Sequence, residues 1–122
     1  MELKRYVLTE LHGIIDTTKV YDDETNDYKI DNEELLVRHH STTTVFTSFG
    51  KVKKTSDNLL DLVEVGDLVE EVLICQVTSI ERDANGNITR FYYLLGSIAW
   101  FDVKAIYKRQ QNGDFKRYEV KE

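Results

Sequence analysis

Residues 72–95, VLICQVTSIERDANGNITRFYYLL, decide the fold expected of this chain, because they contain its clearest turn signal. Two runs rich in β-branched and aromatic residues, 72–82 and 88–95, flank the pair Asn85-Gly86. Asn and Gly tolerate the positive φ angles of a tight turn between antiparallel strands. The stretch therefore predicts a β-hairpin, in which Cys75 is expected to be a small buried thiol.

The C-terminal residues repeat this pattern on a smaller scale. VKAIYKRQ at 103–110 and DFKRYEV at 114–120 flank the pair Asn112-Gly113. The two arms are short and rich in Lys and Arg, which discourage pairing with a further strand. We therefore expect a second hairpin at the edge of a sheet.

The N-terminal part carries weaker β signals. KRYVLTE at 4–10 and TTTVFTSF at 42–49 are typical of strands, and residues 19–30 predict two short strands around the acidic turn 22–27. DNEELLVR at 31–38 begins with an Asp that suits a helix N-cap, followed by Glu and three apolar residues, and predicts a single helical turn.

Residues 58–72, NLLDLVEVGDLVEEV, predict scaffold and no chemistry. Ser56 or Asp57 is expected to cap one helical turn, after which the chain reverses at Gly66-Asp67, where Asp67 bonds the local backbone. The residues expected in the core are Leu59, Leu60, Leu62, Val63, Leu68, Val69, Val72 and Leu73. Those expected on the solvent side are Glu64, Asp67, Glu70 and Glu71. An alternative interpretation makes this stretch an acidic contact patch.

Together these patterns predict a mainly β protein. The run V-x-V-G-D-x-V at 63–69 is common at the start of a twisted strand in small SH3-like barrels, where glycine permits the tight bend. We expect an SH3-like or related antiparallel β-barrel with an irregular N-terminal extension and at most two short helical turns. The predicted organisation is a single domain, 1–122, with an extension or added strands at 1–41 and a barrel core at 42–122.

Composition places the chain among globular proteins. It has 122 residues, 41% of them hydrophobic and 31% charged, and no apolar run near the roughly 20 residues that cross a bilayer. The N-terminus shows no apolar segment of about 7–15 residues ahead of a cleavage site. The single cysteine excludes a disulfide framework. These features predict a cytoplasmic protein without a membrane partner.

Charge is unevenly distributed along the chain. The net formal charge is −6, and the last 22 residues form a basic tail on an acidic body. Duplex nucleic acid is bound through clustered Lys and Arg, so we do not expect it as a partner. The basic tail leaves room for a local anion site.

Two stretches resemble a known group of proteins. Residues 50–69, GKVKKTSDNLLDLVEVGDLV, and 102–120, DVKAIYKRQQNGDFKRYEV, are similar to short uncharacterised proteins of phages and prophages of Firmicutes. Their shared motif is K-x-S-x-N-[IL]-[IL]-D-L-[IV]-E-V-G-D. The resemblance implies a phage accessory protein that works in the host cytoplasm, and small proteins of this kind are often defence inhibitors, including anti-CRISPR proteins, or host-interaction factors.

The sequence contains no recognisable catalytic or metal motif. His39 and His40 are adjacent, so on a strand they point to opposite faces and do not readily share one metal ion. The acidic run 22–27 lacks the glycine and the distal glutamate of an EF-hand loop. There is no nucleophile elbow and no complete phosphate-binding loop. We therefore expect no enzyme activity, no cofactor and no metal.

Three functions remain open. The first is contact with a host protein, for which the candidate residues are acidic: Asp22, Asp23, Glu24, Asp27, Glu70 and Glu71. The second is sequestration of a nucleotide defence signal, because Arg and aromatic side chains together stack bases and neutralise phosphates. The candidates for that site are Trp100, Tyr107, Lys108, Arg109 and Arg117.

The third open function is a structural role in the virion or its assembly. Aromatic residues at 91–93 contribute to both faces of one predicted strand, which suggests that a partner or a second subunit covers one face. A homo-oligomer is therefore also expected.

Overall fold

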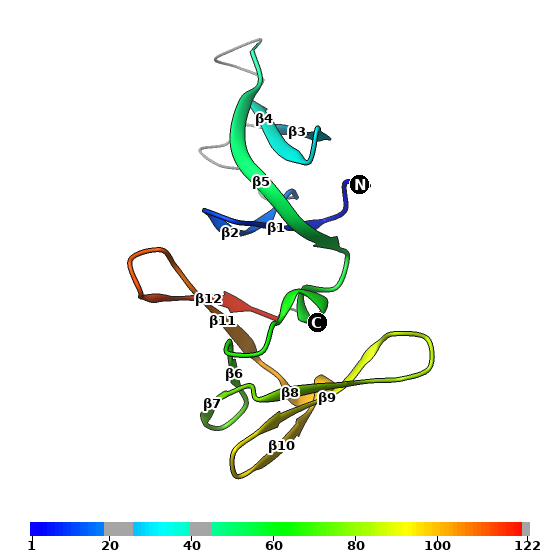
Figure 1. The fold of residues 1–122 in the computed structure, drawn as a ribbon, viewed down its shortest axis with the longest axis vertical. Helices are drawn as coiled ribbons and strands as arrows, with labels where there is room; N and C mark the ends of the chain where they lie inside the picture. Colours follow the sequence, from blue (N-terminus) through cyan, green and yellow to red (C-terminus); the bar gives the residue numbers. More distant parts are fainter. Residues whose placement is uncertain (19–25, 40–44, 121–122) are drawn as a thin grey trace. The chain divides into compact units, whose positions relative to one another are not determined.

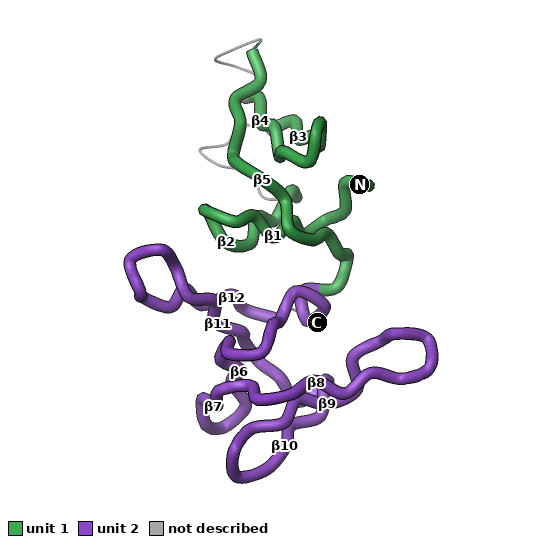
Figure 2. Tube along the Cα trace, in the orientation of Figure 1, with its two compact units in different colours: residues 1–58 green, residues 59–122 purple. Residues whose placement is uncertain are grey.

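The computed structural model describes residues 1–18, 26–39 and 45–120. It is mainly β, with 55% strand and 7% helical residues. The expected mainly β class is confirmed, and none of the antiparallel sheets built by the described residues closes into a barrel. The chain divides into two compact units, residues 1–58 and 59–122 (Figure 2). Within the described ranges no helix is long and apolar enough to span a bilayer.

Unit 1 is a five-stranded antiparallel sheet in the order β2-β1-β5-β4-β3 (Figure 1). Its strands are β1 (Tyr6–Thr9), β2 (Gly13–Asp16), β3 (Asn26–Asp31), β4 (Glu34–His39) and β5 (Thr47–Ser56). The core consists of Val7, Leu35, Val37 and Val52, with Ile15, Tyr28, Ile30 and Phe49 packed against it. The strand expected at 4–10 is confirmed as β1.

The long strand β5 joins the two halves of this sheet. It pairs with β1 on one side and β4 on the other, so it belongs to unit 1, whereas the sequence placed the whole of it in a barrel core at 42–122. The strand expected at 42–49 starts at Thr47, and residues 42–44 lie outside the described part. Gly50 adopts a φ of 104° where the register with β4 shifts, a conformation suited to glycine.

A tight turn connects β3 to β4, where a helical turn was expected. Asn32 and Glu33 have φ angles of 51° and 63°, and Asp31 pairs with Glu34 across the turn. Leu35 and Val37 are buried while Leu36 and Arg38 are only half-buried, which is the period-two pattern of a strand. The predicted helical turn at 31–38 was wrong, because the alternation of apolar residues outweighed the capping signal. Of the two strands expected around the acidic turn, only β3 lies in the described part.

Unit 2 contains a four-stranded and a three-stranded antiparallel sheet. The first has the order β12-β11-β6-β7 and the second β10-β9-β8. The strands are β6 (Leu68–Glu70), β7 (Ile74–Gln76), β8 (Ser79–Arg82), β9 (Ile88–Tyr93), β10 (Gly96–Ala99), β11 (Ala105–Arg109) and β12 (Phe115–Glu119). Two 3₁₀ turns, η1 (Leu59–Leu62) and η2 (Trp100–Asp102), complete the unit.

Both predicted hairpins are confirmed. β8 pairs with β9 around Asn85-Gly86, and β11 pairs with β12 around Asn112-Gly113, where β12 is an outer strand as expected. The first run is not one strand: it divides into β7 and β8 at the buried Val77. Cys75, expected to be buried, is half-buried.

The stretch 58–72 forms scaffold only up to β6. The helical turn is confirmed as η1, and Ser56 Oγ accepts a hydrogen bond from the Asn58 N–H. The Asp67 carboxylate bonds the local backbone as expected, but its side chain is buried and not on the solvent side. Val72 and Leu73 were expected in the core and are instead 83% and 72% exposed. They lie in the β6–β7 loop, because the pairing of Glu70 with Ile74 leaves residues 71–73 outside the ladder.

Candidate protein-contact site

The β6–β7 loop and the first residue of β7 present three consecutive apolar side chains to solvent. Val72, Leu73 and Ile74 are 83%, 72% and 53% exposed. They follow Glu70 and Glu71, two of the acidic residues predicted to bind a partner. We call residues 70–74 the loop surface.

The hydrogen bonding of β6 fixes the position of this loop. Glu70 pairs with Ala105 of β11 on one side and with Ile74 of β7 on the other. The Glu71 N–H donates to the Leu73 carbonyl oxygen at 3.1 Å, which closes the loop. Because both neighbours of β6 are paired strands, the apolar side chains are presented on a defined backbone.

The 3₁₀ turn η2 leads into β11 and lies at the same end of the four-stranded sheet as the loop surface. The Lys104 N–H donates to the Glu70 carbonyl oxygen at 2.7 Å. β6 and β11 are antiparallel, so the residues that follow Glu70 and those that precede Lys104 run off in the same direction. Trp100 and Phe101 of η2 are 47% and 68% exposed, and their rings meet edge to face. This end of unit 2 is therefore rich in exposed apolar groups.

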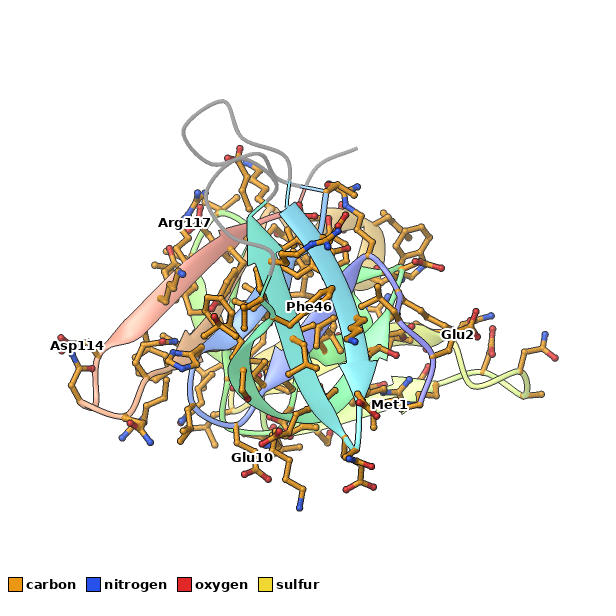
Figure 3. The ribbon with its side chains drawn as sticks, turned by 90° about the horizontal axis from the view of Figure 1, so that it is seen from above. Met1, Glu2, Glu10, Phe46, Asp114 and Arg117 are labelled. Carbon is orange, nitrogen blue, oxygen red and sulfur yellow. The ribbon has the colours of Figure 1, made fainter. Side chains whose placement is uncertain are left out.

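Glu70 is held by two side chains of the hairpin opposite. The Tyr107 hydroxyl donates to Glu70 Oε1 at 2.5 Å, and Arg117 Nε lies 3.5 Å from the same oxygen. Figure 3 shows Arg117 on β12, beyond the turn that contains Asp114. The hydrogen bond from Tyr107 is the main cause that lowers the pKa of Glu70, and the same bond raises the pKa of Tyr107. Glu70 is thus a carboxylate with fixed orientation and a neighbouring cation.

Of the other predicted acidic residues, the structure describes Asp27, which is not in the same unit as Glu70 and Glu71. Asp27 belongs to unit 1, where it forms an ion pair with Arg38. Arg38 and Lys29 also lie over the ring of Phe46, with Cζ and Nζ at 5.2 Å and 4.3 Å from its centroid (Figure 3). Asp22, Asp23 and Glu24 lie outside the described residues.

The residues predicted to bind a nucleotide are divided by the sheet. Tyr107, Arg109 and Arg117 lie on one face, whereas Lys108 points to the other, because alternate residues of a strand face opposite ways. Lys108 is buried and paired with Asp67 and Glu64. Trp100 precedes β11 and Arg109 ends it, so about 13 Å of strand separates the two ends. Arg109 lies over the Phe115 ring, with Cζ 5.0 Å from its centroid.

Sequence reasoning missed the apolar part of the loop surface. Val72, Leu73 and Ile74 were assigned to a continuous strand because the run 72–82 is rich in β-branched residues. The neighbouring pair Glu70-Glu71 was the one available signal of exposure. Only the strand pairing shows that both types of residue lie together where β6 turns into β7.

In the described part of the chain, no three His, Cys, Asp or Glu residues are grouped so that they could hold a metal ion. Comparison with protein-family models, with curated proteins and with solved structures found no match to this chain.

Proposed function

We propose that this protein is a phage-encoded accessory protein that acts without catalysis, by binding a host protein. The loop surface is the binding site, and the proposed target is a component of an antiviral defence complex. The observation that carries the proposal is the row of three exposed apolar side chains at 72–74. The phage origin rests on the motif resemblance at 50–69.

Exposed apolar residues gathered on a rigid element are typical of interaction sites. Burying one side chain such as Val, Leu or Ile contributes about 1.5–3 kcal/mol. The three residues of the loop surface therefore supply enough apolar contact for the centre of a small interface, with Glu70 and Glu71 at its polar rim. Carboxylates at a rim mainly accelerate association with a basic partner and select against acidic ones.

We also propose that unit 2 is related to the SH3-like barrels. It is supported by the glycine bend at 66, by the succession of short antiparallel strands, and by η2, which lies between β10 and β11. Small barrels of this kind commonly use loops at one end for binding.

The test uses a matched pair of variants of the full chain. Val72→Ser removes an apolar side chain from the loop surface, and Val65→Ser makes the same chemical change at a residue that is 63% exposed at the other end of β6. Tagged protein is used to capture partners from host lysate, and the partner identified by mass spectrometry is then purified and titrated by calorimetry.

We expect a stoichiometric host protein whose affinity falls about tenfold with Val72→Ser, as for loss of about 1.4 kcal/mol. Val65→Ser should bind like the wild type. If the two variants bind the partner equally well, the binding site is not the loop surface. If no stoichiometric host protein is captured, the proposed function is wrong.

A further inference from the structure

Strand β10 has an open edge that carries no charge. It is an outer strand of the sheet β10-β9-β8, and its pairing partner is β9. No hydrogen bond within the described part of the chain reaches its other edge. Residues 94–101, LLGSIAWF, contain neither a charged residue nor a proline. Open edges without such residues are ready to pair with another strand.

The other outer strands are blocked by charge or by length. Lys116 and Arg117 lie on β12, Lys29 and Asp27 lie on β3, β8 carries Glu81 and Arg82, and β2 ends at Asp16. β7 has no charged residue, but it is only three residues long. Exposed apolar residues precede it, whereas Val77, which follows it, is buried. Among the outer strands of the described residues, β10 is therefore the one that neither charge nor shortness protects.

Large apolar side chains stand exposed at both ends of β10. Leu94 and Leu95 form the tip of the β9–β10 hairpin, and each is 89% exposed. Trp100 and Phe101 follow the strand in η2. Hairpin tips of two residues usually consist of Asn, Asp or Gly, so two leucines there have no local explanation. The ring of Tyr93 covers Gly96, because a Cβ at that glycine would lie 3.1 Å from the Tyr93 hydroxyl oxygen.

We propose that β10 pairs antiparallel with β10 of a second copy of this chain. The turn that joins Tyr93 to Gly96 directs the Gly96 N–H toward β9. Along an antiparallel strand the direction of these groups alternates, so the N–H and C=O of Ser97 and Ala99 face the open edge. The bonds between two copies then join Ser97 of each to Ala99 of the other.

This register makes the two copies complementary. In this register the turn that precedes β10 in one copy meets η2, which follows β10 in the other, so Leu95 lies near Phe101 of the other copy, and the relation occurs twice by symmetry. The exposed apolar groups at the ends of β10 thus cover each other, and no like charges are brought together. The two three-stranded sheets become one sheet of six strands, and the two-fold contact closes on itself without forming a fibre.

The experiment measures the molecular mass of the full chain by light scattering after size exclusion, with native mass spectrometry alongside. The wild type is expected at twice its 14.3 kDa. Leu95→Glu and Phe101→Lys should each return the mass to that of the monomer. The double variant L95E/F101K should restore the dimer, because a Glu of each copy then faces a Lys of the other. The control Leu73→Glu, in the β6–β7 loop, should leave the dimer intact.

Three outcomes would overturn the pairing. They are a monomeric wild type at about 100 μM, where even weak homodimers are populated; dimers that survive Leu95→Glu; and a double variant that stays monomeric although circular dichroism shows it folded. If the wild type is a monomer and Leu95→Glu abolishes its capture of a host protein, the edge of β10 binds that host protein and not a second copy. Val72→Ser should not change the mass, so failure of the proposed function and failure of the dimer are distinguishable.

Discussion

Lys108 Nζ lies 2.6 Å from Asp67 Oδ2, and the two side chains are only 5% and 12% exposed. Glu64, which is far more exposed, lies 3.0 Å from the same nitrogen. The Asp67 carboxylate also accepts a hydrogen bond from the Glu64 N–H at 2.8 Å. One lysine of the second hairpin therefore ties β11 to the reversal at Gly66-Asp67 that precedes β6.

Replacing this lysine should destabilise the protein strongly. Lys108→Met removes the cation and leaves Asp67 buried without it, for which we expect a loss of about 3 kcal/mol in the free energy of unfolding. The measurement is urea denaturation followed by circular dichroism. Lys104→Met, at an exposed position beside the same strand, should change stability by less than about 0.5 kcal/mol. Equal midpoints for the two variants would show that the ion pair contributes nothing.

A substitution in the turn at Asn32-Glu33 should stabilise the protein. Glu33 has a φ of 63°, a conformation that costs an L-residue with a side chain about 1 kcal/mol and that glycine adopts readily. Glu33→Gly is therefore expected to stabilise the protein by up to about 1 kcal/mol. Glu34→Gly, one residue later in β4, should destabilise it by about 0.5–1 kcal/mol. The same urea titration distinguishes the two, and a destabilised Glu33→Gly would show that the turn is not strained.

The bond between Tyr107 and Glu70 should make stability depend on pH in both directions. The pKa of Glu70 is lowered from 4.5 by this bond, so its contribution is present above pH 4.5 and is lost as the pH falls through the folded-state value. The pKa of Tyr107 is raised from 10.0, so its contribution is present below pH 10.0 and is lost as the pH rises through its folded-state value.

The variant Glu70→Gln isolates this effect. The difference in unfolding free energy between wild type and variant should be largest between these two pH values and shrink outside them. Urea titrations across the pH range measure it. In the Glu70→Gln background, Tyr107→Phe should produce no further change in pH dependence, and a constant difference at all pH values would contradict the role of the bond.

A panel of cyclic and linear nucleotides should not stabilise the protein. Lys108 is buried in its ion pairs, Tyr107 and Arg117 are engaged with Glu70, and Trp100 and Arg109 lie at opposite ends of β11. A bound ligand at about 100 times its dissociation constant would add roughly 2.7 kcal/mol, which a thermal-shift assay detects readily. A shift that disappears in Arg109→Ala would restore the nucleotide hypothesis.

Local turn chemistry could be predicted from the sequence with little loss. Gly86 and Gly113 have φ angles of 85° and 92°, and each follows an asparagine at the tip of a predicted hairpin. The helical turn η1 was equally predictable, because Ser56 bonds the Asn58 N–H just before it and its leucines are buried. These features depend on residues a few positions apart, so the information needed is contained in one short segment.

Pairing between distant segments could not be predicted in this way. β5 was expected to begin a barrel, but it joins β1 and β4 in a separate unit. The pattern of β-branched residues indicates a strand without naming its neighbours, because any strand edge offers the same backbone hydrogen bonds. The exposure of Val72 and Leu73 could not be predicted for the same reason, because their place in a loop depends on the pairing of Glu70 with Ile74.

The sequence by itself determined that this protein is mainly β and where its two hairpins turn, because glycine and asparagine fix the backbone locally. Only the tertiary structure decided which lysine is buried, which carboxylates are neutralised and which apolar residues face solvent. Lys108 and Asp67 are 41 positions apart, and their contact arises from the packing of β11 beside β6. The loop surface and the open edge of β10 likewise depend on the order in which the strands pair, and the conformational preferences of neighbouring residues do not determine that order.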